Sequence, residues 1–257
     1  MRRNQFNIFS KFLVFLLLLT QANQAQQMFI SSGRLSFEKK TAQLSLFESI
    51  VDEGDNIFID ELKKSHPKIV TDYYTLDFNT GGSLFKLEKE VPENKYMLMG
   101  TQPDPKNYVA QHFDDSSTTM RLGVFENNYL VKDSIQSYNW KMTGEVREIA
   151  GFMCRKATTK IGDSVVVVAF YTDEVLVRGG PFNFNGLPGM ILGIAVPRLH
   201  MTIFATKLEL ANQLNSFNYP VENKPKFVTR KKVQSDIDKG VNDWGKFANL
   251  LRWNSIL

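Results

Sequence analysis

A dense run of glycine and proline, followed at once by an apolar segment, constrains the fold of this chain most. Five glycines and two prolines fall within residues 179–193. Pro188 fixes φ at the second position of a turn and Gly189 accepts a positive φ at the third, as a type II turn requires. Residues 190–196 then have the composition of a strand buried on both faces, with a bulge expected at Gly193. The chain is therefore expected to reverse sharply here and to return through the core of a β-rich fold.

The same run permits two interpretations. Phe182 and Phe184 are two residues apart, so in an extended segment they share one side, with Asn183 and Asn185 on the other. Such a segment serves as a ligand or partner platform if a rigid scaffold holds it, because binding residues often lie on loops of that kind. The second interpretation is a plain corner between two core strands.

Further strands are predicted by apolar and polar residues that alternate along the rest of the chain. They are expected at residues 28–38, 69–78, 84–87, 118–125, 129–132, 151–160, 165–172 and 201–210. Turn-forming residues between neighbouring segments favour hairpins, so the strands are expected to pair antiparallel.

Two helices are also predicted. Residues 56–64 form a short one, which Pro67 should end. Near the C-terminus, Ser235 and Asp238 resemble a capping box, and apolar residues follow at helical spacing. That apolar stripe consists of Ile237, Val241, Trp244, Phe247 and Leu251. It either faces the core or forms a partner or membrane surface. The predicted fold is therefore mainly β (α+β): a curved antiparallel sheet with a C-terminal amphipathic helix.

The first residues have the composition of a secretory signal. Three basic residues precede or border the apolar residues 12–19, and residues 20–25 are polar and small. We expect cleavage after Ala25, with Ala22 as the competing site. The apolar segment is shorter than the roughly 20 residues that cross a bilayer, and no second apolar run of that length follows. The sequence thus predicts a periplasmic or extracellular mature chain, residues 26–257, that forms a single domain without a transmembrane span.

Charge gives no reason to expect a nucleic acid partner. The full chain has a net charge of +4, but three of its 31 basic residues and none of its 27 acidic residues lie in the predicted signal. The mature chain is therefore close to neutral, whereas nucleic-acid-binding domains usually carry a strongly basic face.

Cys154 is the only cysteine, so an intrachain disulfide is impossible. On the predicted strand it shares a face with Phe152, which favours a small buried hydrophobe. A nucleophile, a metal ligand and a redox thiol remain as alternatives, and a catalytic thiol would need a neighbour that lowers its pKa.

A search for catalytic motifs finds no nucleophile elbow, phosphate-binding loop, zinc-protease motif or C-x-x-C pair. His112 with Asp114 and Asp115 is the nearest approach to a metal half-site. Residues 52–55 match a calcium loop in composition alone. Solvated turns are the preferred interpretation of both, so no catalytic residue, metal site or cofactor is predicted.

One family resemblance is carried by three segments. Residues 180–192 (GPFNFNGLPGMIL), with residues 149–158 and 169–172, resemble the GLPGLI family of secreted bacterial proteins. Trp140 stands where that family often has a tryptophan, while Met190 and Phe170 replace its usual leucine and tryptophan. The resemblance implies an exported β-rich protein with no agreed catalytic residues. The strand-rich pattern, with helices packed inside the curve, is also similar by analogy to the half-open barrel of periplasmic lipoprotein carriers.

The sequence therefore predicts a non-enzymatic cell-envelope module that binds an apolar ligand or an envelope protein. The alternative is a metal-handling protein or an enzyme that uses Cys154 or the His112 region. Oligomeric state is left open. The candidate ligand-binding or partner-binding residues are Trp140, Cys154, Phe182, Phe184, Pro188 and Gly189.

Overall fold

The structure is a computed structural model that describes residues 29–51, 56–98, 101–124, 127–162, 164–211, 217 and 225–255. The predicted signal at residues 1–25 and the acidic residues 52–55 lie outside the described part. Among the described helices, none is long and apolar enough to cross a membrane.

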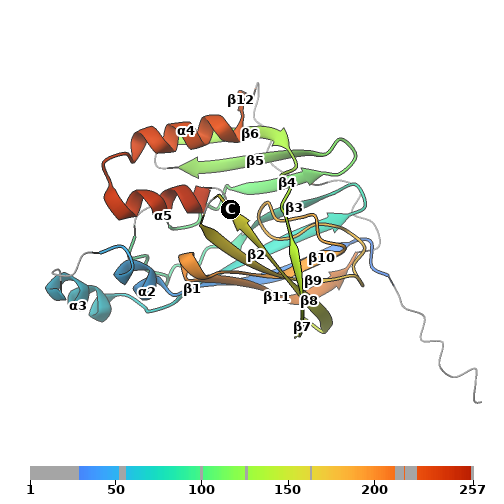
Figure 1. The fold of residues 1–257 in the computed structure, drawn as a ribbon, viewed down its shortest axis with the longest axis horizontal. Helices are drawn as coiled ribbons and strands as arrows, with labels where there is room; N and C mark the ends of the chain where they lie inside the picture. The colour runs from blue at the N-terminus through green and yellow to red at the C-terminus, as the bar shows by residue number, and fades with distance from the viewer. Residues whose placement is uncertain are drawn as a thin grey trace, which may run out of the picture.

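One large curved sheet forms the body of the molecule (Figure 1). Its spatial order is β12-β6-β5-β4-β3-β2-β1-β11-β10-β9-β8-β7. All neighbours pair antiparallel except β12, which runs parallel to β6, and the described strands do not close the sheet into a ring. The prediction of a mainly β fold with a curved, open sheet is therefore confirmed. The strands are β1 (Gly33–Thr41), β2 (Val70–Asn79), β3 (Gly82–Lys89), β4 (Tyr108–His112), β5 (Ser117–Val124), β6 (Asn127–Ser134), β7 (Lys141–Ile149), β8 (Phe152–Ile161), β9 (Val165–Thr172), β10 (Met190–Val196), β11 (Met201–Leu210) and β12 (Phe227–Val228).

Strand β1 lies in the middle of the sheet and pairs with β2 on one side and β11 on the other. Consecutive hairpins connect β2 through β6 on the first side and β7 through β11 on the second. The period-2 pattern of β1 buries Leu35 and Phe37, and this face packs into the main core. Lys39 continues the same alternation and lies opposite Asp72 of β2.

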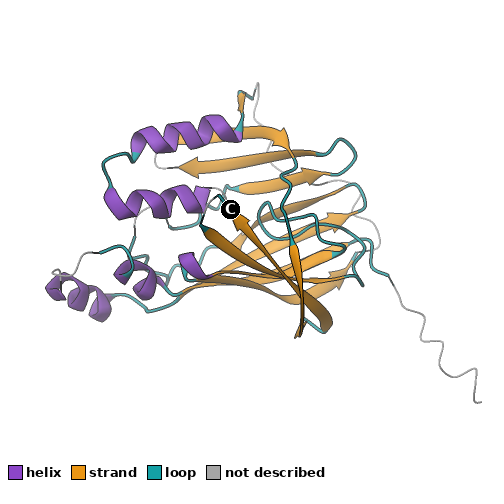
Figure 2. Ribbon diagram, in the orientation of Figure 1, coloured by secondary structure: helices purple, strands orange, loops and turns teal. Residues whose placement is uncertain are grey.

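The helices gather at one end of the strands, on the left of Figure 2. They are α2 (Gln43–Glu48), α3 (Asn56–Ser65), the 3-10 helix η1 (Pro197–Leu199), α4 (Arg230–Gly240) and α5 (Gly245–Ser255). The predicted helix at residues 56–64 is confirmed as α3.

The predicted C-terminal helix is confirmed, but its description as one element that starts at Ser235 was wrong. Two helices form, and the first begins five residues earlier, where the Thr229 side chain accepts a hydrogen bond from Lys232 N at 3.3 Å. Gly240 ends α4, and Gly245, with φ +54°, starts α5. Glycine is a poor helix former, and two glycines this close favour a break.

Three of the described strands, β4, β7 and the two-residue β12, were not predicted. Strand β7 is mostly exposed and lies at an edge of the sheet, so it lacks the apolar alternation that reveals a half-buried strand. The bulge expected at Gly193 is present as a register shift between Ile191 and Gly193 in the β9–β10 pair. An added Cβ at Gly193 would lie 2.5 Å from the Phe204 ring, so any other residue would require that ring to shift.

Candidate functional site

A cavity of about 170 Å³ lies between the sheet and the connection from β9 to β10. Three aromatic rings form its floor. Tyr74 stacks on Phe85 with ring centroids 4.9 Å apart, and Phe182 meets Phe85 edge-on at 4.9 Å. Strand pairing brings Tyr74 and Phe85 together, because Tyr74 pairs with Leu87 and Phe85 is two residues away on the same face of β3. Phe182 is supplied by the connection from β9 to β10.

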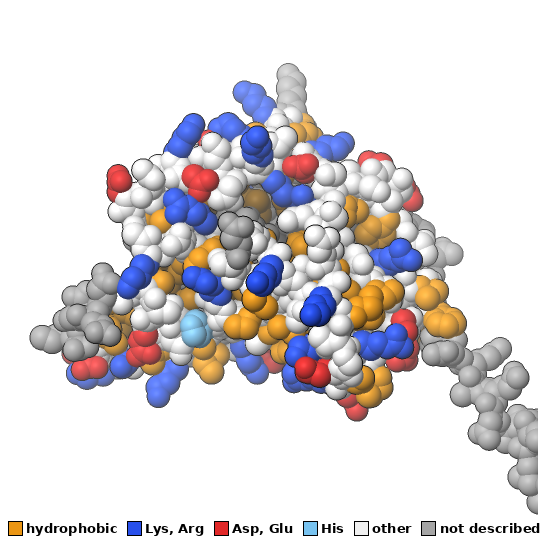
Figure 3. Space-filling view, viewed as in Figure 1, with side chains coloured by type: hydrophobic (Ala, Val, Ile, Leu, Met, Phe, Trp, Pro, Cys, Tyr) orange, Lys and Arg blue, Asp and Glu red, His pale blue; other side chains and the backbone are white. Residues whose placement is uncertain are grey.

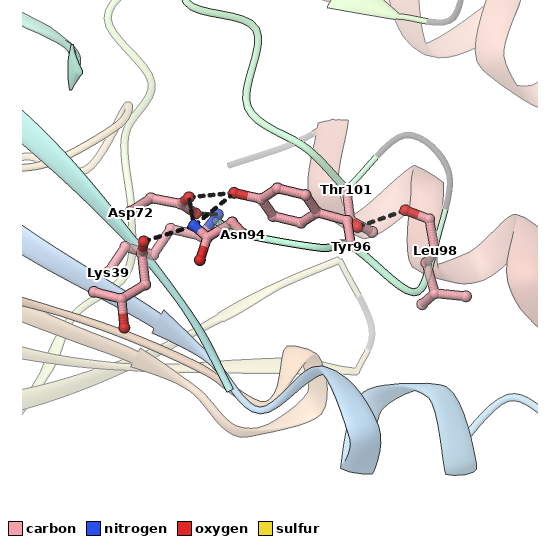
Figure 4. Close-up of polar contacts among 7 residues, drawn as sticks. Lys39, Asp72, Asn94, Tyr96, Leu98 and Thr101 are labelled. Carbon is pink, nitrogen blue, oxygen red and sulfur yellow. Dashed lines mark hydrogen bonds and ion pairs between the residues drawn. The ribbon is translucent and has the colours of Figure 1, made fainter. Parts of the chain in front are cut away.

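A largely buried ion pair lies next to Tyr74 of the floor. Figure 4 shows this pair, Lys39 and Asp72, with its polar partners. Lys39 Nζ lies 3.3 Å from Asp72 Oδ2, and the two side chains are only 13% and 3% exposed. The Tyr96 hydroxyl donates a hydrogen bond to Asp72 Oδ1, and Asn94 Nδ2 donates a second one at 3.2 Å. Lys39 Nζ also lies 5.9 Å from the centre of the Tyr74 ring. Asp72 thus fixes the lysine and ties the segment after β3 to the sheet.

Both tyrosines near Asp72 remain neutral phenols. Burial raises the pKa of Tyr74 far above its ordinary value, and the charge of Asp72 raises it further. Burial is also the largest cause of the raised pKa of Tyr96, followed by its hydrogen bond to Asp72. Tyr96 is therefore a permanent hydrogen-bond donor at neutral pH.

The rim of the cavity is polar. Arg121 Nη1 lies 3.0 Å from Asp104 Oδ2, and Asn107 Oδ1 accepts a hydrogen bond from Gly123 N at 2.8 Å. Burial alone would raise the pKa of Asp104, but hydrogen bonds from Lys106 N and from Arg121 outweigh it, so the pKa is lowered. Asp104 is ionised at neutral pH. An aromatic floor below an ionised polar rim suits a ligand with one apolar face and hydroxyl groups at its edge.

The predicted platform at residues 182–185 divides between two places. Phe182, with φ +56°, lies at the cavity, whereas Phe184 is fully buried. The Phe184 ring centroid lies 5.2 Å from that of Tyr138 and 6.3 Å from that of Trp140, whose Nε1 donates to Asn185 O at 2.8 Å. The expectation that both phenylalanines share one side was wrong, because the positive φ at Phe182 turns the backbone between them.

Pro188 and Gly189 belong to a corner and do not line the cavity. Pro188 is exposed, while Gly189 is buried with φ +136°. Gly189 N donates to Leu187 O at 2.8 Å, so the turn closes over three residues and is tighter than a type II turn.

Cys154 is fully buried, and burial raises the pKa of its thiol to about 12, with a further contribution from the charge of Glu174. We expect a disulfide reagent at mildly alkaline pH to leave the folded protein unmodified and to label Cys154 completely in denaturant, because the thiolate is the reactive species. Absorbance of the thiol released from the reagent measures the extent of labelling in the folded and in the denatured protein. Rapid labelling of the native chain would contradict the buried assignment.

The His112 region does not assemble a metal site in the described part of the chain, where no three His, Cys, Asp or Glu residues lie close enough to hold an ion. Asp115 Oδ1 instead accepts a hydrogen bond from Ser117 N at 3.0 Å.

Sequence reasoning missed the polar residues that line the cavity and those that hold its lysine in place. Leu35 and Phe37 alternate on the buried face of one strand, and Lys39 occupies the next position of that pattern, where an apolar residue is expected. On the other strand, Asp72 occupies the position that precedes Tyr74 and Leu76 in the same kind of pattern. A charge at a core position of a strand is a usable signal, since buried charges are paired or functional. The missed residues are Lys39, Asp72, Asn94, Tyr96, Asp104, Asn107 and Arg121.

Comparison with known proteins identifies one family. The model described as "N-glycanase peptide, N-terminal domain" matches residues 101–230. The structure of PNGF-II in space group P21 shares the fold, with a TM-score of 0.53 and 14% identity over 79% of this chain. The structure of PNGF-II in space group C2 has a TM-score of 0.48 and 14% sequence identity over 77% of this chain. An uncharacterized conserved protein from Thermus thermophilus has a TM-score of 0.39 and 5% identity, and the match covers 77% of this chain and 90% of that protein. No curated protein matches.

The chain spans about a third of PNGF-II, covering 32% of that chain in the P21 form and 31% in the C2 form. Residues 180–192, on which the GLPGLI resemblance rested, lie inside the matched segment. The GLPGLI prediction was therefore wrong, and the predictions of a non-enzymatic envelope module and of a protein that is not an enzyme fall with it.

Proposed function

Because the chain belongs to the family of N-glycanase N-terminal domains, we propose that it acts on the asparagine-linked glycans of glycoproteins, as an N-glycanase. The cavity between β2, β3 and Phe182 is the part that we assign to the glycan. Its floor of Tyr74, Phe85 and Phe182 beneath a charged rim is the observation that carries this assignment.

A pyranose ring matches both parts of the cavity. Its C–H face packs on an aromatic ring, while its hydroxyls both donate and accept hydrogen bonds. Asp104 accepts from hydroxyls, Arg121 donates to them, and Asn107 does both. The cavity holds one such ring rather than a long glycan, because its volume is only about 170 Å³.

The carboxylates of Asp104 and Asp72 have different roles. Asp104 is 31% exposed at its side chain and faces the cavity, but its lowered pKa makes it a weak base at neutral pH. We therefore assign it to binding hydroxyls. Asp72 is sealed from solvent and positions Lys39 beside the ring. Glycoproteins meet such an enzyme outside the cytoplasm if the predicted signal operates, so a periplasmic or extracellular location is part of the proposal.

Release of glycan from a defined glycopeptide tests the activity. Hydrolysis of the glycan–asparagine amide adds water, frees the glycan as its amine and leaves aspartate in the peptide, which mass spectrometry identifies. A peptide that keeps its first sugar would show cleavage within the glycan and contradict an N-glycanase. Absence of both cleavage and glycan binding would overturn the proposal.

Replacing Phe182 by alanine is expected to weaken binding of N,N′-diacetylchitobiose about tenfold, because the variant removes one ring of the floor. Isothermal titration calorimetry gives the dissociation constant. Phe170→Ala is the matched control, since Phe170 is also half-buried and packs on a ring, that of Phe204 at 6.1 Å, but does not line the cavity. Equal affinities for the two variants would contradict the assigned site.

A further inference from the structure

The turn between α4 and α5 presents an aromatic pair. Trp244 and Phe247 lie with ring centroids 5.7 Å apart and planes only 10° from parallel. Trp244 is 41% exposed, although its sequence neighbours in the apolar stripe, Ile237 and Val241, are buried. A hydrogen bond from Trp244 N to Val241 O at 3.1 Å holds the turn that carries the indole outward.

A polar groove runs along α4 to the same turn. Its residues are spaced by three or four positions and so share one side of the helix. Arg252 Nε of α5 donates a hydrogen bond to Asp238 Oδ1 at 2.8 Å, and Gln234 Nε2 donates one to the same atom at 3.3 Å. These bonds hold the Asp238 carboxylate in one position in the groove. The groove ends at Asn242, two residues before Trp244. Its lining is Lys231, Gln234, Ser235, Asp238, Lys239 and Asn242.

We propose that the Trp244–Phe247 pair and this groove form a second sugar site, which takes an outer sugar of a branched glycan. This inference rests on the proposed function, because the same glycan would occupy the cavity with its inner end. A single exposed apolar side chain carries no such meaning. Here, however, a flat aromatic surface follows two residues after Asn242, the last residue that lines the groove, and the bond from Trp244 N to Val241 O keeps the two close. The amide, hydroxyl and carboxylate groups of the groove match sugar hydroxyls.

The groove is a poor match to a membrane. A helix that lies on a bilayer pairs a wide apolar face with a mainly basic one. The groove carries Asp238 as well as Lys231 and Lys239, and acidic and basic side chains are interspersed over the helical part of the face in Figure 3. Its side chains are all polar, so a lipid chain finds no surface beyond the two rings.

Calorimetric titration of the full chain with two ligands tests the second site. N,N′-diacetylchitobiose probes the cavity alone, and a complete biantennary N-glycan probes both sites. Trp244→Ala is expected to bind the complete glycan about tenfold more weakly and the disaccharide unchanged. Phe227→Ala is the matched control, because Phe227 is a similarly exposed aromatic residue (46%) that precedes α4 and does not line the groove. Circular dichroism establishes that each variant is folded.

The outcomes separate the two proposals. If the wild type binds both ligands and Trp244→Ala leaves both affinities unchanged, the second site is wrong and the cavity stands. If Trp244→Ala weakens binding to phosphatidylglycerol vesicles but leaves the affinity for the glycan unchanged, the Trp244–Phe247 pair is a membrane-binding surface and the second sugar site is wrong. If the wild type binds neither ligand and releases no glycan from the glycopeptide, the proposed function itself fails.

Discussion

Replacing Asp72 by alanine is expected to lower the free energy of unfolding by about 3–5 kcal/mol, as for other buried ion pairs that lose one partner. The variant would leave the Lys39 ammonium, 13% exposed, without its counter-charge. It would also remove the acceptor of Tyr96 and one of the acceptors of Asn94. Urea denaturation followed by tryptophan fluorescence measures the change.

Asp77→Ala is the matched control for Asp72→Ala. Asp77 lies on the same strand and is also buried, but its partner Arg34 has a side chain that is 47% exposed. Water can solvate Arg34 when Asp77 is removed, so we expect a loss of only about 1 kcal/mol. Equal losses for the two variants would mean that Lys39 escapes to solvent and that Asp72 does not fix it beside the cavity.

Gly189→Ala is expected to lower the free energy of unfolding by about 3 kcal/mol, from the strain of a positive φ and from a steric clash. A Cβ at this position would stand 2.0 Å from Thr172 O, which belongs to the backbone of β9, a strand paired on both sides, and cannot move away freely. Thermal denaturation followed by circular dichroism gives the change.

Gly186→Ala separates the two causes. Gly186 also has a positive φ, +88°, but the nearest atom to its Cβ would be Trp140 Nε1 at 3.8 Å, which is ordinary contact. The backbone strain alone should cost about 1 kcal/mol. If Gly186→Ala proved as damaging as Gly189→Ala, close approach to Thr172 would not be what requires glycine at the corner.

Local patterns in the sequence predicted most of the sheet. Alternation and turn residues identify the β2–β3 and β8–β9 hairpins and the bulge at Gly193, because neighbouring residues determine each of them. The break between α4 and α5 was missed, since the apolar stripe continues through it. The family assignment was wrong because it also relied on a short stretch of the chain. It rested mainly on residues 140–196, whereas the matching family model extends over residues 101–230.

The cavity could not be predicted because distant segments build it. The Lys39–Asp72 pair depends on the β1–β2 register, Tyr96 and Asn94 come from a segment without regular structure, and Phe182 comes from the β9–β10 connection. Of these, the sequence singled out only Phe182. Charges at core positions of two strands would have indicated a site, but not which partners they meet.

The central position of β1 determines how the chain must fold. Among the described strands, β1 alone joins the β2–β6 hairpins to the β7–β11 hairpins, and its partners in β11 lie far along the chain, as in the bond from Thr206 Oγ1 to Ser36 O across 170 residues. Each hairpin series can form locally and early. The pairing of β1 with β11 closes a much longer loop of chain and is therefore expected to form later. Strand β1, which precedes the other described strands along the chain, is therefore among the last to gain both partners. Until then, β2 and β11 each expose an edge that invites pairing with other chains.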